Sequence, residues 1–139
     1  MPTTKRVQYA ALPYRRRGDS RTEVMLVTSR ETGRWIIPKG WPQKRKKPHT
    51  SAAREAREEA GVVGKIERDP IGSYSYEKKL SSGDLIACEV RVFPLKVSRQ
   101  KRGWPEKEER KSQWFSRTKA SKAVTEPALS KIIRTFRKR

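Results

Sequence analysis

The chain has little cysteine, little histidine and no long apolar run, and each scarcity excludes a class of protein. Its 139 residues include one Cys and one His, so a disulfide framework is excluded and His49 is expected to be a loop residue. Cys88 lies in an apolar run and is expected to be a buried structural thiol. No apolar run reaches the roughly 18 residues of a membrane span, and residues 1–20 lack a signal peptide's apolar stretch. We therefore expect a cytoplasmic protein without membrane association.

Acidic residues are also scarce relative to basic ones. The chain has 35 Lys and Arg against 15 Asp and Glu, a formal net charge of +20. Such an excess attracts polyanions, so a phosphate-rich partner is expected; the alternative is that the charge serves only solubility. With 33% apolar residues, including four Trp, the chain can bury one core but not two. We expect a single domain over residues 1–139.

Turn residues and apolar periodicity divide the chain into strands and helices. Strands are expected at residues 6–13, 23–28, 34–37, 62–67, 71–77, 85–97 and 113–115. The first two form a hairpin whose turn, Arg15 to Ser20, contains Gly18 and Asp19. Residues 39–42 and 99–111 are expected to be loops. Helices are expected at residues 51–60, with Thr50 as N-cap and Gly61 after the last turn, and from an N-cap at Ser116 to about Val124. A basic amphipathic helix is expected at about 127–138, with Leu129, Ile132, Ile133 and Phe136 on its apolar face.

The helix at residues 51–60 carries an unusual set of charges. Glu55, Glu58 and Glu59 fall within one arc of about 100°, and Ala53, Ala56 and Ala60 cluster on an adjacent face expected to meet a close neighbour. Like charges three or four residues apart destabilise a helix, and these lie near the negative end of its dipole. An external counter-charge is indicated, most economically a divalent cation. The alternative is a solvated acidic face paired with Arg54 and Arg57.

The surrounding residues resemble the signature of the Nudix hydrolases. That signature is a Gly, five residues, a Glu, seven residues, then Arg-Glu-aliphatic-any-Glu-Glu-any-Gly-aliphatic. Gly40 opens it here, and residues 54–62, REAREEAGV, close it at the same spacing. Lys46 replaces the first Glu, and Ala56 occupies the aliphatic position. The flanking residues 35–42, WIIPKGWP, resemble the diphosphoinositol polyphosphate and diadenosine polyphosphate phosphohydrolase branch.

The resemblance implies an α+β fold, a Nudix-type α/β/α sandwich with a mixed β-sheet, and hydrolysis of a phosphoanhydride with Mg²⁺ or Mn²⁺. Carried over by position, Glu58 and Glu59 would be direct metal ligands and Glu55 a further ligand or a water-positioning group. The Gly40 carbonyl would be a ligand from the loop, and Arg54 would orient the carboxylates. A general base can lie outside the signature. Glu89, Glu106, Glu108 and Glu109 all remain open for that role.

Basic residues flank this signature and are expected to bind substrate phosphates. They are Arg30, Arg34, Lys39 and Lys46, the last within a run of cations at residues 44–47. We expect a pyrophosphohydrolase acting on a dinucleoside polyphosphate or an inositol pyrophosphate, or, as the nearest variant, on RNA 5′ ends. Because Lys46 departs from the signature, the alternative is a catalytically weak Nudix domain that binds nucleic acid or a phosphorylated ligand through its basic surface. The sequence does not indicate an oligomeric state.

Overall fold

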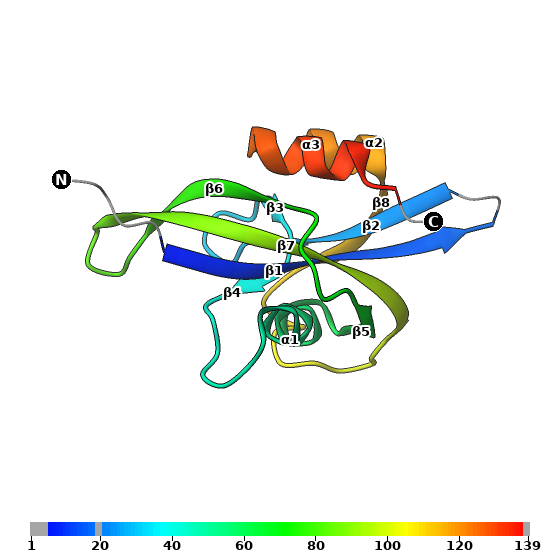
Figure 1. Ribbon diagram of the computed structural model, residues 1–139, viewed down its shortest axis with the longest axis horizontal. Coiled ribbons are helices and arrows are strands. Elements are labelled where there is room, and N and C mark those ends of the chain that lie inside the picture. Colours follow the sequence, from blue (N-terminus) through cyan, green and yellow to red (C-terminus); the bar gives the residue numbers. More distant parts are fainter. Residues whose placement is uncertain (1–5, 19–20, 138–139) are drawn as a thin grey trace.

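One mixed β-sheet forms the centre of the molecule, and helices cover both of its faces (Figure 1). The computed structural model describes residues 6–18 and 21–137. The strands are β1 (Arg6–Arg17), β2 (Arg21–Thr28), β3 (Trp35–Ile36), β4 (Lys39–Gly40), β5 (Val62–Ile66), β6 (Gly72–Lys79), β7 (Leu85–Gln100) and β8 (Ser112–Ser116). The helices are α1 (Pro48–Ala60), α2 (Arg117–Ala123) and α3 (Pro127–Thr135). In Figure 1, α1 lies on one side of the sheet and α2 and α3 lie on the other.

Strand pairing confirms the predicted mixed sheet and the α+β sandwich. Strand β1 is parallel to β7 and antiparallel to β2. The long strand β7 pairs with β6 along its first half and with β5 along its second half, antiparallel in both cases. The short strand β4 pairs with β1, and β8 pairs with β2. The sheet therefore brings β4, at the start of the Nudix signature, beside the central strand.

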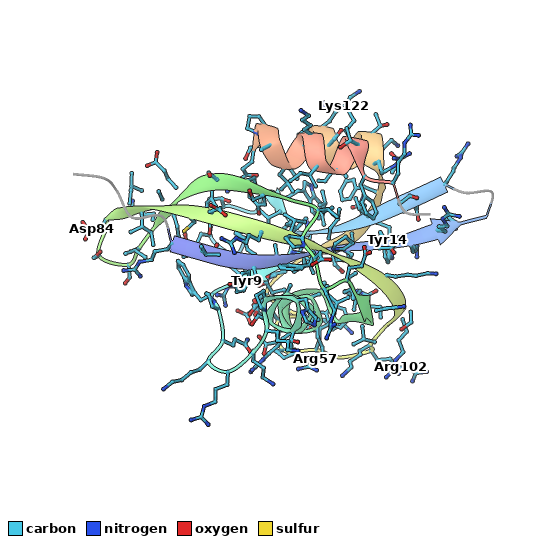
Figure 2. The ribbon with its side chains drawn as sticks, in the orientation of Figure 1. Tyr9, Tyr14, Arg57, Asp84, Arg102 and Lys122 are labelled. Carbon is cyan, nitrogen blue, oxygen red and sulfur yellow. The ribbon has the colours of Figure 1, made fainter. Side chains whose placement is uncertain are left out.

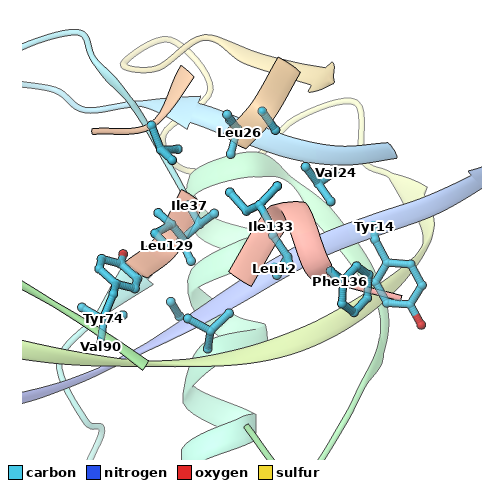
Figure 3. Packing of buried hydrophobic residues seen from close by; sticks show 14 residues of the cluster. Leu12, Tyr14, Val24, Leu26, Ile37, Tyr74, Val90, Leu129, Ile133 and Phe136 are labelled. Atoms are coloured by element: carbon cyan, nitrogen blue, oxygen red, sulfur yellow. The ribbon is translucent and has the colours of Figure 1, made fainter. Parts of the chain in front are cut away.

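The side chains of β1 alternate between two hydrophobic cores. Ala10, Leu12 and Tyr14 pack toward α2 and α3, with Ile133 and Phe136 among their neighbours (Figure 3). Ala11 and the alanines of α1 belong to the other core. This alternation follows from the two-residue period of a strand whose two faces are both covered. Both helical layers are thus held by buried apolar contact with the same strand.

Several element boundaries differ from the sequence-based prediction. Residues 39 and 40 are not a loop but form β4, because their backbone pairs with Tyr9 and Ala10. Strand β1 continues to Arg17, so the predicted turn is shorter; Asp19 and Ser20 lie outside the described residues. Helix α3 ends at Thr135, and residue 138, the predicted end, is also outside them. Within the described part of the chain, no helix has the length and apolar character needed to span a bilayer.

Candidate active site

Helix α1 is a rigid platform for the predicted carboxylates. It starts earlier than expected: Lys47 is the N-cap, Pro48 occupies the first turn and Thr50 lies inside the helix, because proline's fixed φ suits that turn. Gly61 ends the helix in the left-handed conformation, with φ 69°.

The alanine face that meets the sheet differs by one position from the predicted one. Ala52, Ala56 and Ala60 are fully buried, whereas Ala53 is only half-buried. A spacing of four residues keeps these three on one stripe, and their small side chains allow the helix to approach the sheet closely. The glutamates are therefore carried on a helix whose position is fixed by packing.

Glu59 is the most buried of the three glutamates of α1. The residue is 5% exposed, and Arg110 Nη2 lies 3.8 Å from its Oε1. Burial raises the pKa of Glu59 to about 8, although the positive charge of Arg110 opposes the shift. The repulsion from Glu55 adds to it. With a pKa of about 8, the Glu59 carboxyl is not fully ionised near neutral pH.

Glu55 lies between α1 and β4. A methyl group built on Gly40 would overlap the Glu55 carboxyl, so a larger residue there would displace this carboxyl from its position. Gln43 Nε2 lies 3.4 Å from Glu55 Oε2. Burial raises the pKa of Glu55, as does the charge of Glu58. The backbone of β4 and the Glu55 carboxyl are therefore in direct contact.

The Glu58 carboxylate is held by Arg54 on the same helix. Arg54 Nε donates to Glu58 Oε1 at 2.8 Å, and Arg54 Nη1 donates to Gln43 Oε1 at 2.9 Å. Gln43 thus connects Arg54 with Glu55. Sequence reasoning missed Gln43, because no motif position marks it.

The carboxyl groups of α1 could bind a divalent ion. Among the described residues, no group of three or more His, Cys, Asp or Glu is already arranged to hold a metal ion. The donor chemistry nevertheless suits Mg²⁺ or Mn²⁺, because Glu55 and Glu59 are carboxyls with raised pKa values and Glu55 lies against the backbone of Gly40. A cation there would offset both the burial that disfavours the charged carboxylates and the repulsion between them. The residues fit the ion, and Arg54 holds the Glu58 carboxylate through Oε1.

The loop between β7 and β8 supplies two charged residues to the same region. Glu106 N–H donates to the Glu58 carbonyl at 3.0 Å, which ties the loop to the end of α1. Arg110 is 9% exposed at its side chain and pairs with Glu106 at 2.8 Å as well as with Glu59. Arg110 also donates to the Thr28 carbonyl. Sequence reasoning missed Arg110, because only the folded loop brings it to the helix.

The four candidate bases differ in their distance from the glutamates of α1. Three of them lie in this loop, and Glu89 lies on β7. Glu106 lies close enough to Glu55 and Glu59 for its charge to raise both pKa values. Glu109 pairs with Arg30 at 3.0 Å, and Glu108 is exposed. Glu89 pairs with Arg91 on β7 at 3.1 Å. Of these four, Glu106 is therefore the one whose charge acts on both Glu55 and Glu59.

The predicted phosphate-binding cations occupy different surroundings. Arg34 Nη1 contacts Glu126 Oε2 at 2.7 Å and Thr125 Oγ1 at 2.6 Å. Lys39 Nζ lies 5.0 Å from the centre of the Tyr76 ring. Burial lowers the pKa of Lys39 to about 8, opposed by the charges of Glu59 and Glu126.

Arg30 and Lys46 are placed less favourably for that role. Arg30 is paired with Glu109 and lies 3.9 Å from Glu106. Lys46 is exposed in the loop before α1. The structure therefore brings Lys39 near Glu59, with Arg34 close to Lys39. Arg30 is instead paired with Glu109, and Lys46 is exposed in the loop.

A polar cluster beside Lys39 was also missed from the sequence. Tyr76 donates its hydroxyl proton to Gln8 Oε1 at 2.6 Å, and Gln8 is 3% exposed. Tyr74 is buried on the same strand, 6.4 Å from Tyr76 between ring centres. The alternation of Tyr74 and Tyr76 on one face of β6 was the available signal, but their meeting with Lys39 depends on the tertiary fold.

With this geometry in view, comparison with known proteins identifies the class. The model of the NUDIX domain matches residues 4–136, so the chain belongs to the Nudix family, as its motif predicted. It is 33% identical over 108 residues to Nudix hydrolase 21, chloroplastic, of Arabidopsis thaliana, covering 77% of this chain and 52% of that protein. It is 32% identical over 111 residues to diphosphoinositol polyphosphate phosphohydrolase 3-alpha of Mus musculus, covering 78% and 63%.

Solved structures support the same fold. The C. elegans Ap4A hydrolase binary complex superimposes with a TM-score of 0.70 at 20% identity, covering 92% of each chain. The branch that residues 35–42 resemble is therefore represented among both the relatives and the structures. The chain spans about half the length of several curated relatives, at 52%, 51% and 49%.

Proposed function

We propose that this chain is a metal-dependent pyrophosphohydrolase that cleaves a phosphoanhydride bond in a highly phosphorylated small molecule. A dinucleoside polyphosphate or an inositol pyrophosphate is the proposed substrate class. The observation that carries the proposal is the carboxyl pair on α1: Glu59 is buried, Glu55 lies against Gly40, and burial raises the pKa of both. These are signature positions of the family to which the chain belongs.

The proposed metal site consists of Glu55, Glu58, Glu59 and the Gly40 carbonyl. When bound, Mg²⁺ or Mn²⁺ supplies positive charge to substrate phosphates and lowers the pKa of water. Glu59 would ionise and release its proton on loading, because its pKa lies near 8. Glu58 would be positioned by Arg54, its present partner.

Phosphate binding is proposed for Lys39 and Arg34. Lys39 lies near both Glu59 and the polar cluster of Tyr76 and Gln8, so substrate phosphates there would face the metal site. A phosphate group would also favour the charged form of Lys39. Arg34 would keep its contact with Glu126 while its remaining N–H groups bind phosphate.

Glu106 is the proposed general base. Its backbone is fixed to the end of α1, and its carboxylate is held by Arg110 at 2.8 Å. Its charge acts on both Glu55 and Glu59. A carboxylate at this place is suited to accept a proton from an attacking water.

Phosphate release from a substrate panel tests the proposal. The panel contains dinucleoside polyphosphates, inositol pyrophosphates, nucleoside triphosphates and capped RNA, each with Mg²⁺ or Mn²⁺. Glu58→Gln and Glu59→Gln are each expected to lower turnover by at least about tenfold, because each loses a charged ligand at constant size. Glu77→Gln, the same change at an exposed position of β6, is the matched control. Full activity in both test variants would remove them from the metal site.

The second candidate function is a catalytically weak domain that binds nucleic acid or a phosphorylated ligand. It is favoured by Lys46, which stands where the family signature has Glu and is exposed. Absence of hydrolysis across the whole panel, together with retained binding of a panel member, would favour this function. The cytoplasmic location expected from the sequence stays a prediction.

A further inference from the structure

A groove of about 320 Å³ lies between α1 and β5, outside the carboxylate site. Val62 and Leu95 are buried and form its floor, whereas the cations Lys46 and Arg57 are exposed at its rim. Arg54, Val63 and Gly64 also line it. The lining thus combines three cations with an apolar floor and contains no acidic side chain.

The groove lies on the opposite side of α1 from Glu59. Arg57 and Glu59 are two residues apart, which separates their directions by roughly 160° around a helix. Figure 2 shows Arg57 on α1, beneath the sheet in this view. Arg54 lies between the two directions and belongs to both regions, through its bond to Glu58 and its place in the groove. The groove is therefore adjacent to the metal site but separate from it.

The cations of the groove have unused capacity for an anion. Lys46 and Arg57 have no side-chain hydrogen bond or ion pair with any residue in 6–18 or 21–137. Arg54 uses Nε for Glu58 and Nη1 for Gln43, which leaves further N–H donors of the guanidinium. Guanidinium and ammonium groups that line one groove, with no carboxylate in its lining, are suited to a multiply charged phosphate chain.

We propose that this groove binds the phosphate chain of a polyphosphorylated small molecule. Lys46 and Arg57 supply the free positive charge, and Arg54 adds directed N–H donors. The Lys that breaks the Nudix signature thereby has a function of its own, since a Glu at position 46 would place a negative charge among these cations. The inference does not depend on hydrolysis, because the groove contains none of the proposed metal ligands.

Binding of inorganic tripolyphosphate to the metal-free protein tests the groove. Titration should shift the backbone amide NMR signals of Val63 and Gly64. The double variant Lys46→Gln/Arg57→Gln should weaken binding by roughly tenfold or more, because two charge-assisted contacts are lost. The control is Lys122→Gln/Arg134→Gln, which removes one Lys and one Arg that are exposed on α2 and α3. Lys122 is labelled on the far side of the sheet in Figure 2.

Two results would overturn the proposal. One is an equal loss of affinity in the control, which would show that net charge alone attracts the anion. The other is binding without any shift at Val63 or Gly64. All titrations use matched ionic strength, and melting temperatures of the variants confirm folding. Since no metal is present, failure of this binding and failure of hydrolysis are separate results.

Kinetics then identify the source of the phosphate chain. If the groove binds distal phosphates of the substrate itself, Lys46→Gln/Arg57→Gln raises KM and leaves kcat nearly unchanged. If it binds a separate phosphorylated ligand, KM is unchanged although tripolyphosphate binding is lost. In both cases the control variant retains the parent's tripolyphosphate affinity.

Discussion

At the scale of single residues, the candidate site places opposite charges where little water reaches them. Burial raises the pKa of Glu59 and lowers that of Lys39, both to about 8. Each residue's charge favours ionisation of the other, yet burial is the larger effect for both. Such paired shifts are typical of functional sites, where a ligand supplies the missing charge. Glu59 and Lys39 together therefore favour a site that binds a cation at Glu59 and an anion at Lys39.

The titration of Glu59 predicts a pH effect on the metal-free protein. The folded-state pKa is raised from 4.5 to about 8, so folding favours the protonated form. The resulting stability is fully present below pH 4.5 and is lost as the pH rises through about 8. Relative to Glu59→Gln, which cannot titrate, the free energy of unfolding of the parent should fall across this window.

Urea unfolding at several pH values measures this difference. Lys39 titrates in both proteins, so the comparison removes most of its contribution. Glu77→Gln, at an exposed position, should follow the pH profile of the parent. A difference between parent and Glu59→Gln that does not change with pH would show that Glu59 ionises in the folded protein as it does in the unfolded chain.

The sequence predicted the glutamates of α1 but not their neighbours. Glu55, Glu58 and Glu59 share a helix, so their relation depends only on helical periodicity. Arg110 reaches Glu59 from a loop 51 positions later by residue number. No local pattern encodes such a distance, so this contact required the structure.

At the scale of elements, the end of α1 is coupled to the loop between β7 and β8. Gly61 adopts φ 69° and lies against the Trp104 ring, where a Cβ would overlap the ring. Gly61 carbonyl also accepts from Lys101 N–H at 2.7 Å, and Glu58 carbonyl accepts from Glu106 N–H. These contacts hold the loop that contains Glu106 and Arg110 beside the glutamates of α1.

Gly61→Ala is therefore expected to cost more than an ordinary substitution of a left-handed glycine. Positive φ alone costs an L-residue roughly 1–2 kcal/mol, and displacing Trp104 adds an overpacking cost of about 1–3 kcal/mol. Gly33→Ala is the matched control, because Gly33 has φ 71° and open space where its Cβ would lie. Denaturant unfolding measures both; equal losses of stability would show that Trp104 yields without cost.

The elements were predicted more securely than their boundaries. Strands and helices with clear apolar periodicity appear at their expected places, as in β7 and α3. The start of α1 was misplaced because Thr50 is a good capping residue, while the actual N-cap Lys47 makes no side-chain cap bond. Strand β4 was missed because two residues carry no periodicity, and only their pairing with β1 defines it.

At the scale of the whole molecule, the charge of +20 opposes the compact state. Ion pairs such as Arg30–Glu109 and Arg54–Glu58 offset little of it, since exposed pairs contribute about 0–1 kcal/mol each. With 35 basic and 15 acidic residues, pairing leaves most cations without an acid. Anions from solution are therefore expected to stabilise the fold.

Salt should consequently raise the melting temperature of the metal-free protein. Between ionic strengths of about 0.01 M and 0.15 M the Debye length falls from about 30 Å to about 8 Å, so repulsion among surface cations is screened. Tripolyphosphate at the same ionic strength should raise the melting temperature further, because it binds the folded groove specifically. In Lys46→Gln/Arg57→Gln the chloride effect should persist, with slightly smaller amplitude, while the additional effect of tripolyphosphate disappears. A melting temperature that falls with chloride would mean that ion pairs stabilise the fold more than the excess positive charge destabilises it.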